Sequence, residues 1–301
     1  MSGAVLLSGG TGLIGGRIVP ALSETREVRL LSRRAGEDAR PNVRRVQWDG
    51  QHFPAEALAE TETVVHLAGE PVFGGLPTRA RQARLRHSRI GSTQDLIARI
   101  AELAPGERPG TLVCASAVGF YGDRGEERLP ESASQGQGFL ADLCRDWEAA
   151  ADGAGELGLR VVKLRFGIVL ARGAGALGMM ALAFKTGLGG RLGSGQQWFP
   201  WVHIDDAAAA VLAAVSNPDW SDTVNVVAPN PVKNADLTKV LAAQLGRPAF
   251  MVVPGFAVRL GMGPLADELL GSKYVVPERA TSLGFVWKHE QLASALEAEL
   301  G

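Results

Sequence analysis

The glycine-rich segment at residues 8–16, SGGTGLIGG, constrains the fold most, because it follows the apolar run AVLL directly. Residues 10–15 match G-x-G-x-x-G. An apolar strand ends at Ser8, a helical pattern begins at Leu13, and a second strand ends near Ser32. This order is typical of a dinucleotide-binding βαβ unit, in which a bare main chain and free helix amides approach a pyrophosphate. The alternative is a tight turn with close helix packing. The predicted contacts are Gly9, Thr11, Gly12, Leu13, Ile14 and Gly15.

Short apolar runs alternate with longer helical patterns over the first 166 residues. We predict strands at 4–8, 27–32, 44–48, 63–68, 111–116 and 159–166. We predict helices at 13–22, 79–103 and 139–157. Apolar strands separated by helices indicate a parallel sheet covered on both faces. The expected fold class is therefore α/β, a Rossmann doubly wound parallel sheet.

The residue pattern changes after Phe166, where ARGAGALG and GLGGRLGSGQQ are expected to form glycine-rich loops. A strand is expected at 223–228, with helices capped by Asp205 and Asn234 and a last helix starting near His289. We expect a Rossmann domain at 1–166, to which residues 198–228 return. A smaller α/β substrate domain at 167–301 would pack on it.

The amino-acid composition limits the classes of partner and site that we expect for this protein. The 301 residues carry a formal net charge of −1, so no nucleic-acid or membrane-surface partner is expected. Two cysteines without a C-x-x-C pair and five scattered histidines predict no disulfide framework and no metal site. The N-terminus has no basic leader, and the longest uncharged apolar run, residues 174–184, is shorter than the ~20 residues of a membrane span. A cytoplasmic monomer or homodimer is expected.

The end of the second strand favours NADP(H) over NAD(H). An NAD site places an acid about 20 residues after the glycine loop, whereas arginine accommodates the 2′-phosphate of NADP. This chain has Ser32, Arg33 and Arg34 there, and its nearest acids, Glu37 and Asp38, come later. The alternative is that both arginines are solvated surface charges.

Several motifs resemble those of the extended short-chain dehydrogenase/reductase superfamily: GGTGLIG (9–15), Trp48-Asp49, VVHLAG (64–69), CASAVGFYG (114–122), LRFGIVL (164–170) and WVHIDD (201–206). More narrowly, LAGEP, SAVGFYGD, GLGGRLGSGQQW and APNPVKNADLTK resemble the atypical branch called epimerase-family proteins, as does the C-terminal segment. The resemblance implies that Asp49 accepts from the adenine amino group. It also implies cofactor contacts from Leu67, Ala68, Gly69, Ala115, Phe166, Gly167, Ile168 and Val169.

The resemblance also implies a catalytic Tyr and Lys, spaced as Y-x-x-x-K, and this chain lacks them. In the helix FLADLCRDWEAAA, Leu140 and Cys144 occupy those positions when Glu148 is aligned with the glutamate usual after the motif. Shifting the alignment by one residue gives Phe139 and Leu143. Neither register supplies a proton donor with a cation.

Three other residues are candidates for moving the proton: Ser116, Tyr121 and Glu70. Each has a structural alternative: Ser116 bonds backbone, Tyr121 packs at the sheet edge, and Glu70 pairs with an arginine. His203 is favoured as structural, and Cys144 as a buried thiol, with a low-pKa thiol left open.

Two further features concern the substrate. Nucleotide-sugar enzymes of the superfamily often carry an arginine where this chain has Phe199, which favours a smaller or flatter apolar substrate. The arginine-rich run at 79–89 is interpreted as a solvated helix face or as a site for an anionic group. The leading hypothesis is an NADP(H)-dependent oxidoreductase acting on a small carbonyl or hydroxyl compound. The alternatives are a non-catalytic NADP(H) sensor and a nucleotide-sugar epimerase or dehydratase.

Overall fold

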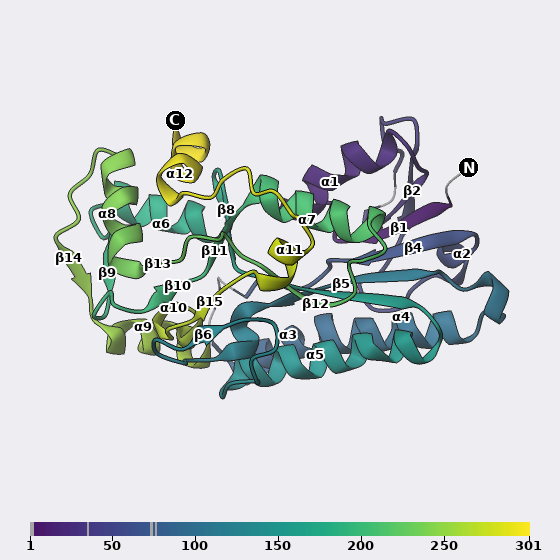
Figure 1. The fold of residues 1–301 in the computed structure, drawn as a ribbon, viewed down its shortest axis with the longest axis horizontal. Coiled ribbons are helices and arrows are strands. Elements are labelled where there is room, and N and C mark those ends of the chain that lie inside the picture. Colours follow the sequence, from purple (N-terminus) through teal and green to yellow (C-terminus); the bar gives the residue numbers. More distant parts are fainter. Residues whose placement is uncertain (1–2, 35, 73–74, 76) are drawn as a thin grey trace.

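A computed structural model describes residues 3–34, 36–72, 75 and 77–301. Its centre is a seven-stranded sheet with the order β12-β7-β5-β4-β1-β2-β3, in which all neighbours run parallel (Figure 1). The strands are β1 (Ala4–Ser8), β2 (Val28–Ser32), β3 (Val43–Gln47), β4 (Thr61–His66), β5 (Thr111–Ala117), β7 (Arg160–Phe166) and β12 (Asp222–Val226). The predicted Rossmann α/β class is confirmed. The strand order reverses between β1 and β4, where such sheets form a ligand crevice.

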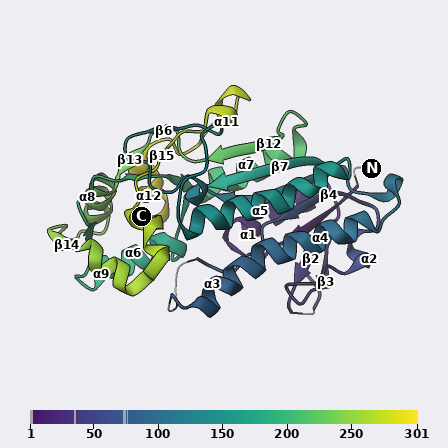
Figure 2. The same cartoon turned by 90° about the horizontal axis from the view of Figure 1, so that it is seen from below.

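Helices cover both faces of this sheet (Figures 1 and 2). One face carries α1 (Leu13–Ser23) and α7 (Ile204–Ser216), and the other carries α4 (Ser92–Ala101) and α5 (Phe139–Glu156). Val5 and Leu7 of β1 pack with the α1 and α7 side, whereas Leu6 packs with the α4 and α5 side. Because side chains alternate along a strand, a strand buried on both faces must be apolar throughout.

The region predicted as one helix at 79–103 has a break in it. It consists of α3 (Arg79–Arg86), a π-helical turn at His87–Gly91 and then α4. A π-helical turn widens the helix locally and is frequent at functional sites. Here it changes the direction of the side chains at Ser88 and Arg89 relative to a continuous α-helix.

The remaining elements form a lobe beside the carboxyl edge of the sheet, shown at the left of Figure 1. Its helices are α6 (Gly175–Lys185), α8 (Asn234–Gln244), α9 (Gly255–Met262), α10 (Asp267–Leu270) and α12 (Leu292–Leu300). Its strands are β8 (Ile168–Ala171), β9 (Gly190–Leu192), β10 (Trp198–Phe199), β11 (Trp201–His203), β13 (Val232–Lys233) and β14 (Met251–Val253). Short elements elsewhere are α2 (Ala55–Leu58), β6 (Arg128–Leu129), β15 (Tyr274–Val275) and α11 (Glu278–Ser282). The later strand β12 pairs with β7, so this part of the chain adds an edge strand to the main sheet.

Two predicted helix caps were wrong. His203, not Asp205, caps α7, because its Nδ1 accepts the Asp205 amide at 3.1 Å. Asn234 is the first residue of α8, and its Oδ1 accepts the Leu192 amide at 2.9 Å, which ties α8 to β9. The last helix begins at Leu292, three residues later than predicted.

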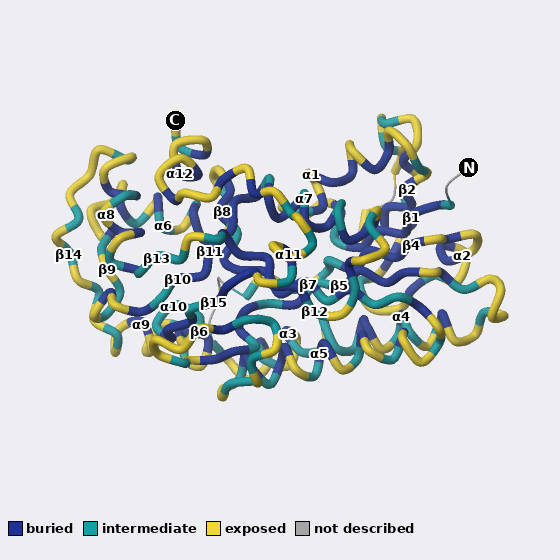
Figure 3. Tube along the Cα trace, in the orientation of Figure 1, coloured by how far each residue is buried: buried dark blue, intermediate teal, exposed yellow. Residues whose placement is uncertain are grey.

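Buried residues lie in the interior of the protein, and exposed residues lie along its outer surfaces (Figure 3). Both cysteines are buried and unpaired. Over the described residues, no helix combines the length and apolar character that a membrane crossing requires.

Candidate functional site

A cavity of about 690 Å³ lies at the carboxyl ends of β1, β4, β5 and β7. Seven residues of the glycine loop and the following strand ends line it: Gly9, Gly12, Leu13, Ile14, Gly15, Leu67 and Gly69. Further around its wall are Ala115, Ser116, Ala117, Phe166, Gly167, Ile168 and Val169. Most residues predicted to contact a dinucleotide therefore line one cavity. Thr11, Ser32, Arg33, Arg34, Asp49 and Ala68 are not among the residues that line it.

The glycine loop needs two of its glycines for close packing. Gly9 has a φ of +76°, a backbone conformation that side chains disfavour. A Cβ at Gly15 would lie 2.3 Å from the Gly9 carbonyl oxygen, so a side chain there would push α1 away from the turn. Within the described chain, no side chain caps the N-terminus of α1 at Gly12. The first amides of α1 thus remain available to an anion such as a pyrophosphate.

The end of β2 places cationic groups beyond the loop. Arg33 and Arg34 are exposed, and no carboxylate among the described residues pairs with either. Asp38, one of the two nearby acids, is held by Arg40 at 2.6 Å and Arg45 at 3.1 Å. The hydrogen bond from Arg40 holds the pKa of this carboxyl far below its usual range, despite its burial. Asp38 is therefore already engaged and is not free to hold a ribose.

Asp49 is engaged by its own loop. Its Oδ1 accepts the amides of Gln51 and His52, and its Oδ2 lies 2.8 Å from His52 Nδ1. These hydrogen bonds, the His52 side chain first, lower the pKa of Asp49 to about 2. The carboxylate stabilises a turn, and its contact with an adenine stays a prediction.

The helix α5 brings the two substituted positions to the cavity wall, since Leu140 and Cys144 both line it. Burial raises the pKa of the Cys144 thiol to about 12, so the thiol stays protonated near neutral pH. A low-pKa nucleophile at this position does not fit the structure. Neither side chain can replace the phenol or the ammonium group of the usual pair.

The three residues predicted to move a proton are in different environments. Ser116 lines the cavity, and its hydroxyl donates to Glu148 Oε1 at 2.5 Å. Tyr121 is fully buried, does not line the cavity, and donates to Asn225 Oδ1 at 2.7 Å. Burial raises its pKa, the opposite of what a catalytic phenol needs. The structure thus separates Tyr121 from Ser116.

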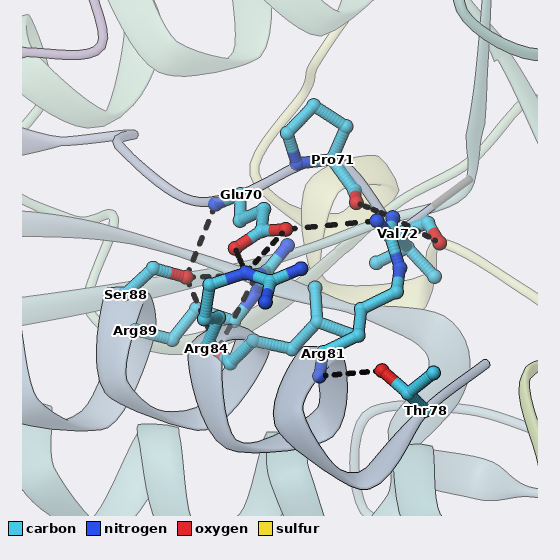
Figure 4. A network of polar contacts seen from close by, with 9 residues as sticks. Glu70, Pro71, Val72, Thr78, Arg81, Arg84, Ser88 and Arg89 are labelled. Carbon is cyan, nitrogen blue, oxygen red and sulfur yellow. Dashed lines mark hydrogen bonds and ion pairs between the residues drawn. The ribbon is translucent and has the colours of Figure 1, made fainter. Parts of the chain in front are cut away.

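Glu70 also does not line the cavity. Its carboxylate pairs with Arg81 at 3.6 Å and Arg84 at 3.3 Å, and its amide donates to Ser88 Oγ at 3.1 Å (Figure 4). These contacts fasten the end of β4 to α3. Glu70 thus pairs with arginines, which is the structural alternative given for it above. The structure gives no support to a role for Glu70 as acid or base.

Beneath Ser116 lies a buried ion pair that the sequence analysis missed. Arg165 donates through Nε and Nη2 to the two Glu148 oxygens at 2.8 and 2.7 Å. It also donates to the Tyr121 hydroxyl at 2.9 Å, and its guanidinium carbon lies 3.5 Å from the centre of the Phe120 ring. An arginine between the buried Leu164 and Phe166 of β7 was the available signal. The pair holds the Glu148 carboxylate in place to accept from Ser116.

The arginine-rich run does not form a uniformly solvated face. Arg81 and Arg84 pair with Glu70, and Arg86 pairs with Asp146, so tertiary contacts supply the acids that are absent nearby in sequence. Arg89 differs, because it lines the cavity and has no carboxylate partner among the described residues. A Cβ at Gly69 would lie 3.2 Å from the Arg89 guanidinium carbon. The π-helical turn thus directs one guanidinium to the strand end where a cofactor would lie.

Glu268 on α10 is the second group that sequence reasoning missed. It lines the same cavity, and its Oε2 is buried without a hydrogen-bond partner in the part of the chain described. The buried Lys273 ammonium lies 3.5 Å away. A Cβ at Gly119 would lie 3.3 Å from Glu268 Oε2, 3.4 Å from Leu140 Cβ and 3.6 Å from Cys144 Sγ. The carboxyl group is therefore close to both positions where Tyr and Lys are missing.

Comparisons with known proteins agree with this arrangement. Residues 5–227 match the NAD dependent epimerase/dehydratase family, and residues 253–299 match a domain of unknown function, DUF1731. The chain is 34% identical over 305 residues to the Arabidopsis thaliana "Epimerase family protein SDR39U1 homolog, chloroplastic", covering 98% of this chain and 86% of the relative.

Solved structures are similar over nearly the whole chain, and two of them share more than 30% sequence identity with it. Human epimerase family protein SDR39U1 (isoform 2), solved with NADPH, has a TM-score of 0.86 and 32% identity, covering 99% of each chain. A nucleoside-diphosphate sugar epimerase from Corynebacterium glutamicum has a TM-score of 0.81 and 33% identity, covering 100% of this chain and 59% of the other. This chain therefore belongs to the NAD-dependent epimerase/dehydratase family, in the atypical branch of epimerase family proteins that carry the C-terminal domain of unknown function.

Proposed function

We propose that this protein is an NADP(H)-dependent oxidoreductase that acts on a carbonyl or hydroxyl compound without the usual Tyr-Lys pair. The observation that carries the proposal is one cavity with two functional ends. The glycine loop and the uncapped N-terminus of α1 line one part, and Ser116 and Glu268 line another. A dinucleotide and a reacting group would meet between them.

The choice of NADP(H) is supported by the free cations after β2 and by the engaged state of Asp38. The human relative was solved with NADPH, which agrees with this choice. Arginine pairs well with phosphate, because its planar fork donates two parallel hydrogen bonds.

An Arg33→Ala variant tests the cofactor choice. We expect it to weaken NADPH binding by about tenfold, the effect of losing one partly solvated charge-assisted hydrogen bond, while NADH binding stays unchanged. Arg44→Ala, at an exposed position on β3, is the matched control and should alter neither cofactor. Fluorescence titration measures both affinities. Equal losses for NADPH and NADH would refute the assignment of the 2′-phosphate to Arg33.

The proton chemistry is assigned to Glu268, with Ser116 orienting the substrate. When bound, the reduced nicotinamide supplies a hydride to a carbonyl carbon. The Ser116 hydroxyl gives its one hydrogen to Glu148, so its oxygen is placed to accept a hydrogen bond from the hydroxyl form of the substrate. Glu268 Oε2, which lacks a hydrogen-bond partner among the described residues and lies 3.5 Å from the Lys273 ammonium, is placed to deliver the proton. The product alcohol carries both hydrogens, and Glu268 regains its proton from water. The Arg89 guanidinium supplies the positive charge that Cys144 cannot.

Isotope transfer tests turnover. Protein mixed with NADPH deuterated at the 4-pro-R or 4-pro-S position and a library of carbonyl compounds should place deuterium in a product alcohol from one of the two. Tight NADPH binding with no label in any product would favour the sensor, an alternative that Leu140 and Cys144 support. Nucleotide-sugar epimerisation, the activity named for the Corynebacterium glutamicum relative, is less well supported, because Phe199 replaces the arginine expected to hold a diphosphate.

A further inference from the structure

We propose that the substrate carries an aliphatic or aromatic hydrocarbon tail, and that this tail fills a second cavity beside the cofactor cavity. The inference rests on the proposed function and specifies its substrate class. The second cavity has a volume of about 360 Å³ and lies within the C-terminal lobe, among α6, α8, β9, β14, α9 and α10. Its larger side chains include Met179, Leu188, Leu192, Phe199 and Leu269.

The lining carries no charged side chain among the described residues. Asn234 and Thr238 are its polar side chains, and the Asn234 oxygen already accepts the Leu192 amide. A phosphate or a sugar would have to give up its hydrogen bonds to water in such a cavity, which is costly without partners. Hydrocarbon groups lose nothing comparable, because their transfer from water is favourable. The chemistry of the wall therefore selects an apolar tail.

The two cavities meet at shared residues. Ala176 and Met179 of α6 line both of them. On α10, Glu268 lines the cofactor cavity and the next residue, Leu269, lines the apolar one. A molecule whose tail occupies the apolar cavity would therefore place its head group beside Glu268. The arrangement connects a site for binding with a site for proton transfer.

Phe199 agrees with this assignment. Its side chain is buried and forms part of the apolar wall. The entrance is apolar as well, since Met179 is 45% exposed and Leu188 is 66% exposed. A cavity of about 150 Å³ holds benzene, so a volume of about 360 Å³ holds on the order of twelve carbon atoms.

A homologous series of 2-ketones tests the tail directly. Each added methylene contributes about 0.8 kcal/mol when buried, so affinity should rise about fourfold per methylene across the series from 2-butanone to 2-decanone. Equilibrium dialysis with gas chromatography measures binding to the full chain saturated with NADP⁺, which has no hydride to give. Equal affinities for 2-butanone and 2-decanone would overturn the proposal.

Two matched leucines on and just after α6 locate the effect. Leu188→Asp places a carboxylate at the apolar entrance of the cavity and should weaken 2-decanone binding by about tenfold. Leu182→Asp, at a residue that is 63% exposed and lines neither cavity, should leave it unchanged. An equal effect of both substitutions would overturn the assignment of the cavity. The assignment would also be overturned if the wild-type protein were a dimer that binds no ketone and if Leu188→Asp made that dimer dissociate. A second copy of the chain would then occupy the site.

The outcomes also separate this inference from the proposed function. Chain-length-dependent binding without isotope transfer from NADPH would refute the oxidoreductase and retain the apolar site. Isotope transfer to small polar carbonyl compounds, with no dependence on chain length, would retain the oxidoreductase and refute the apolar site.

Discussion

Replacing Arg165 with methionine is expected to lower the free energy of unfolding by about 3–5 kcal/mol, because it leaves the buried Glu148 carboxylate without its cation. Both side chains are almost fully buried and joined by two hydrogen bonds of 2.8 and 2.7 Å. The substitution also removes the donor to the Tyr121 hydroxyl at 2.9 Å and the contact with the Phe120 ring. Urea unfolding followed by circular dichroism measures the change.

Two further variants isolate the cause. Arg44→Met, at an exposed position, should change the stability by no more than about 0.5 kcal/mol. The double variant Arg165→Met with Glu148→Leu should recover much of the loss, because an apolar pair of similar volume can replace a buried ion pair. Breaking a buried ion pair usually costs several kcal/mol of stability. A loss below about 1 kcal/mol in Arg165→Met would therefore show that Glu148 does not depend on Arg165.

Replacing Glu268 with glutamine is expected to lower kcat by about 10²- to 10⁴-fold, the usual contribution of a positioned general acid. The amide keeps the shape of the side chain but has no proton acidic enough to transfer. Because Glu268 lies near Leu140 and Cys144 and the substitution leaves the glycine loop unchanged, NADPH affinity should stay unchanged. Steady-state kinetics on the carbonyl compound that the protein reduces, together with NADPH titration, measures the two effects.

The neighbouring carboxylate provides the control. Asp267 begins the same short helix and pairs with the exposed Arg259 at 3.6 Å, and Asp267→Asn should retain full activity. If Glu268 had only a structural role, Glu268→Gln would reduce the yield of folded protein and change KM. The pH dependence of kcat would then stay unaltered. Loss of the limb of the pH profile that reports the acid, with KM retained, is the expected signature. Unchanged kcat in Glu268→Gln would remove Glu268 from the mechanism.

Local sequence pattern was sufficient to predict the sheet. The seven parallel strands lie within one or two residues of the predicted runs. The signal was strongest for central strands such as β1 and β5, because a strand buried on both faces is apolar at consecutive positions. The glycine loop was equally predictable, since Gly9 and Gly15 occupy positions where a side chain would be strained or would clash. The substitution of Leu140 and Cys144 was visible as well, and both residues line the cavity.

Tertiary contacts decided what the pattern could not. Glu70 was a plausible acid by its position after β4, but α3 brings Arg81 and Arg84 to it. Tyr121 was a plausible phenol by elimination, but the chain turns it toward Asn225 and away from the cavity.

Long sequence separation explains the residues that were missed. Glu268 reaches the cavity from a segment far along the chain from the glycine loop, and no local pattern marks it. Arg89 was part of a run that resembled a solvated face, and the π-helical turn that directs it inward has no sequence signature of its own. Side chains that meet only after folding leave little periodic signal for sequence reasoning to use.

Calorimetric titration of the folded wild-type protein with NADPH and NADH is the most direct test of the central claim, that the free amides of α1 and the arginines after β2 bind a phosphorylated dinucleotide. We expect heat and saturation with NADPH, weaker binding of NADH, and loss of both when Gly15→Val pushes α1 from the turn. Absence of heat with both cofactors, on protein whose circular dichroism shows the native fold, would contradict it.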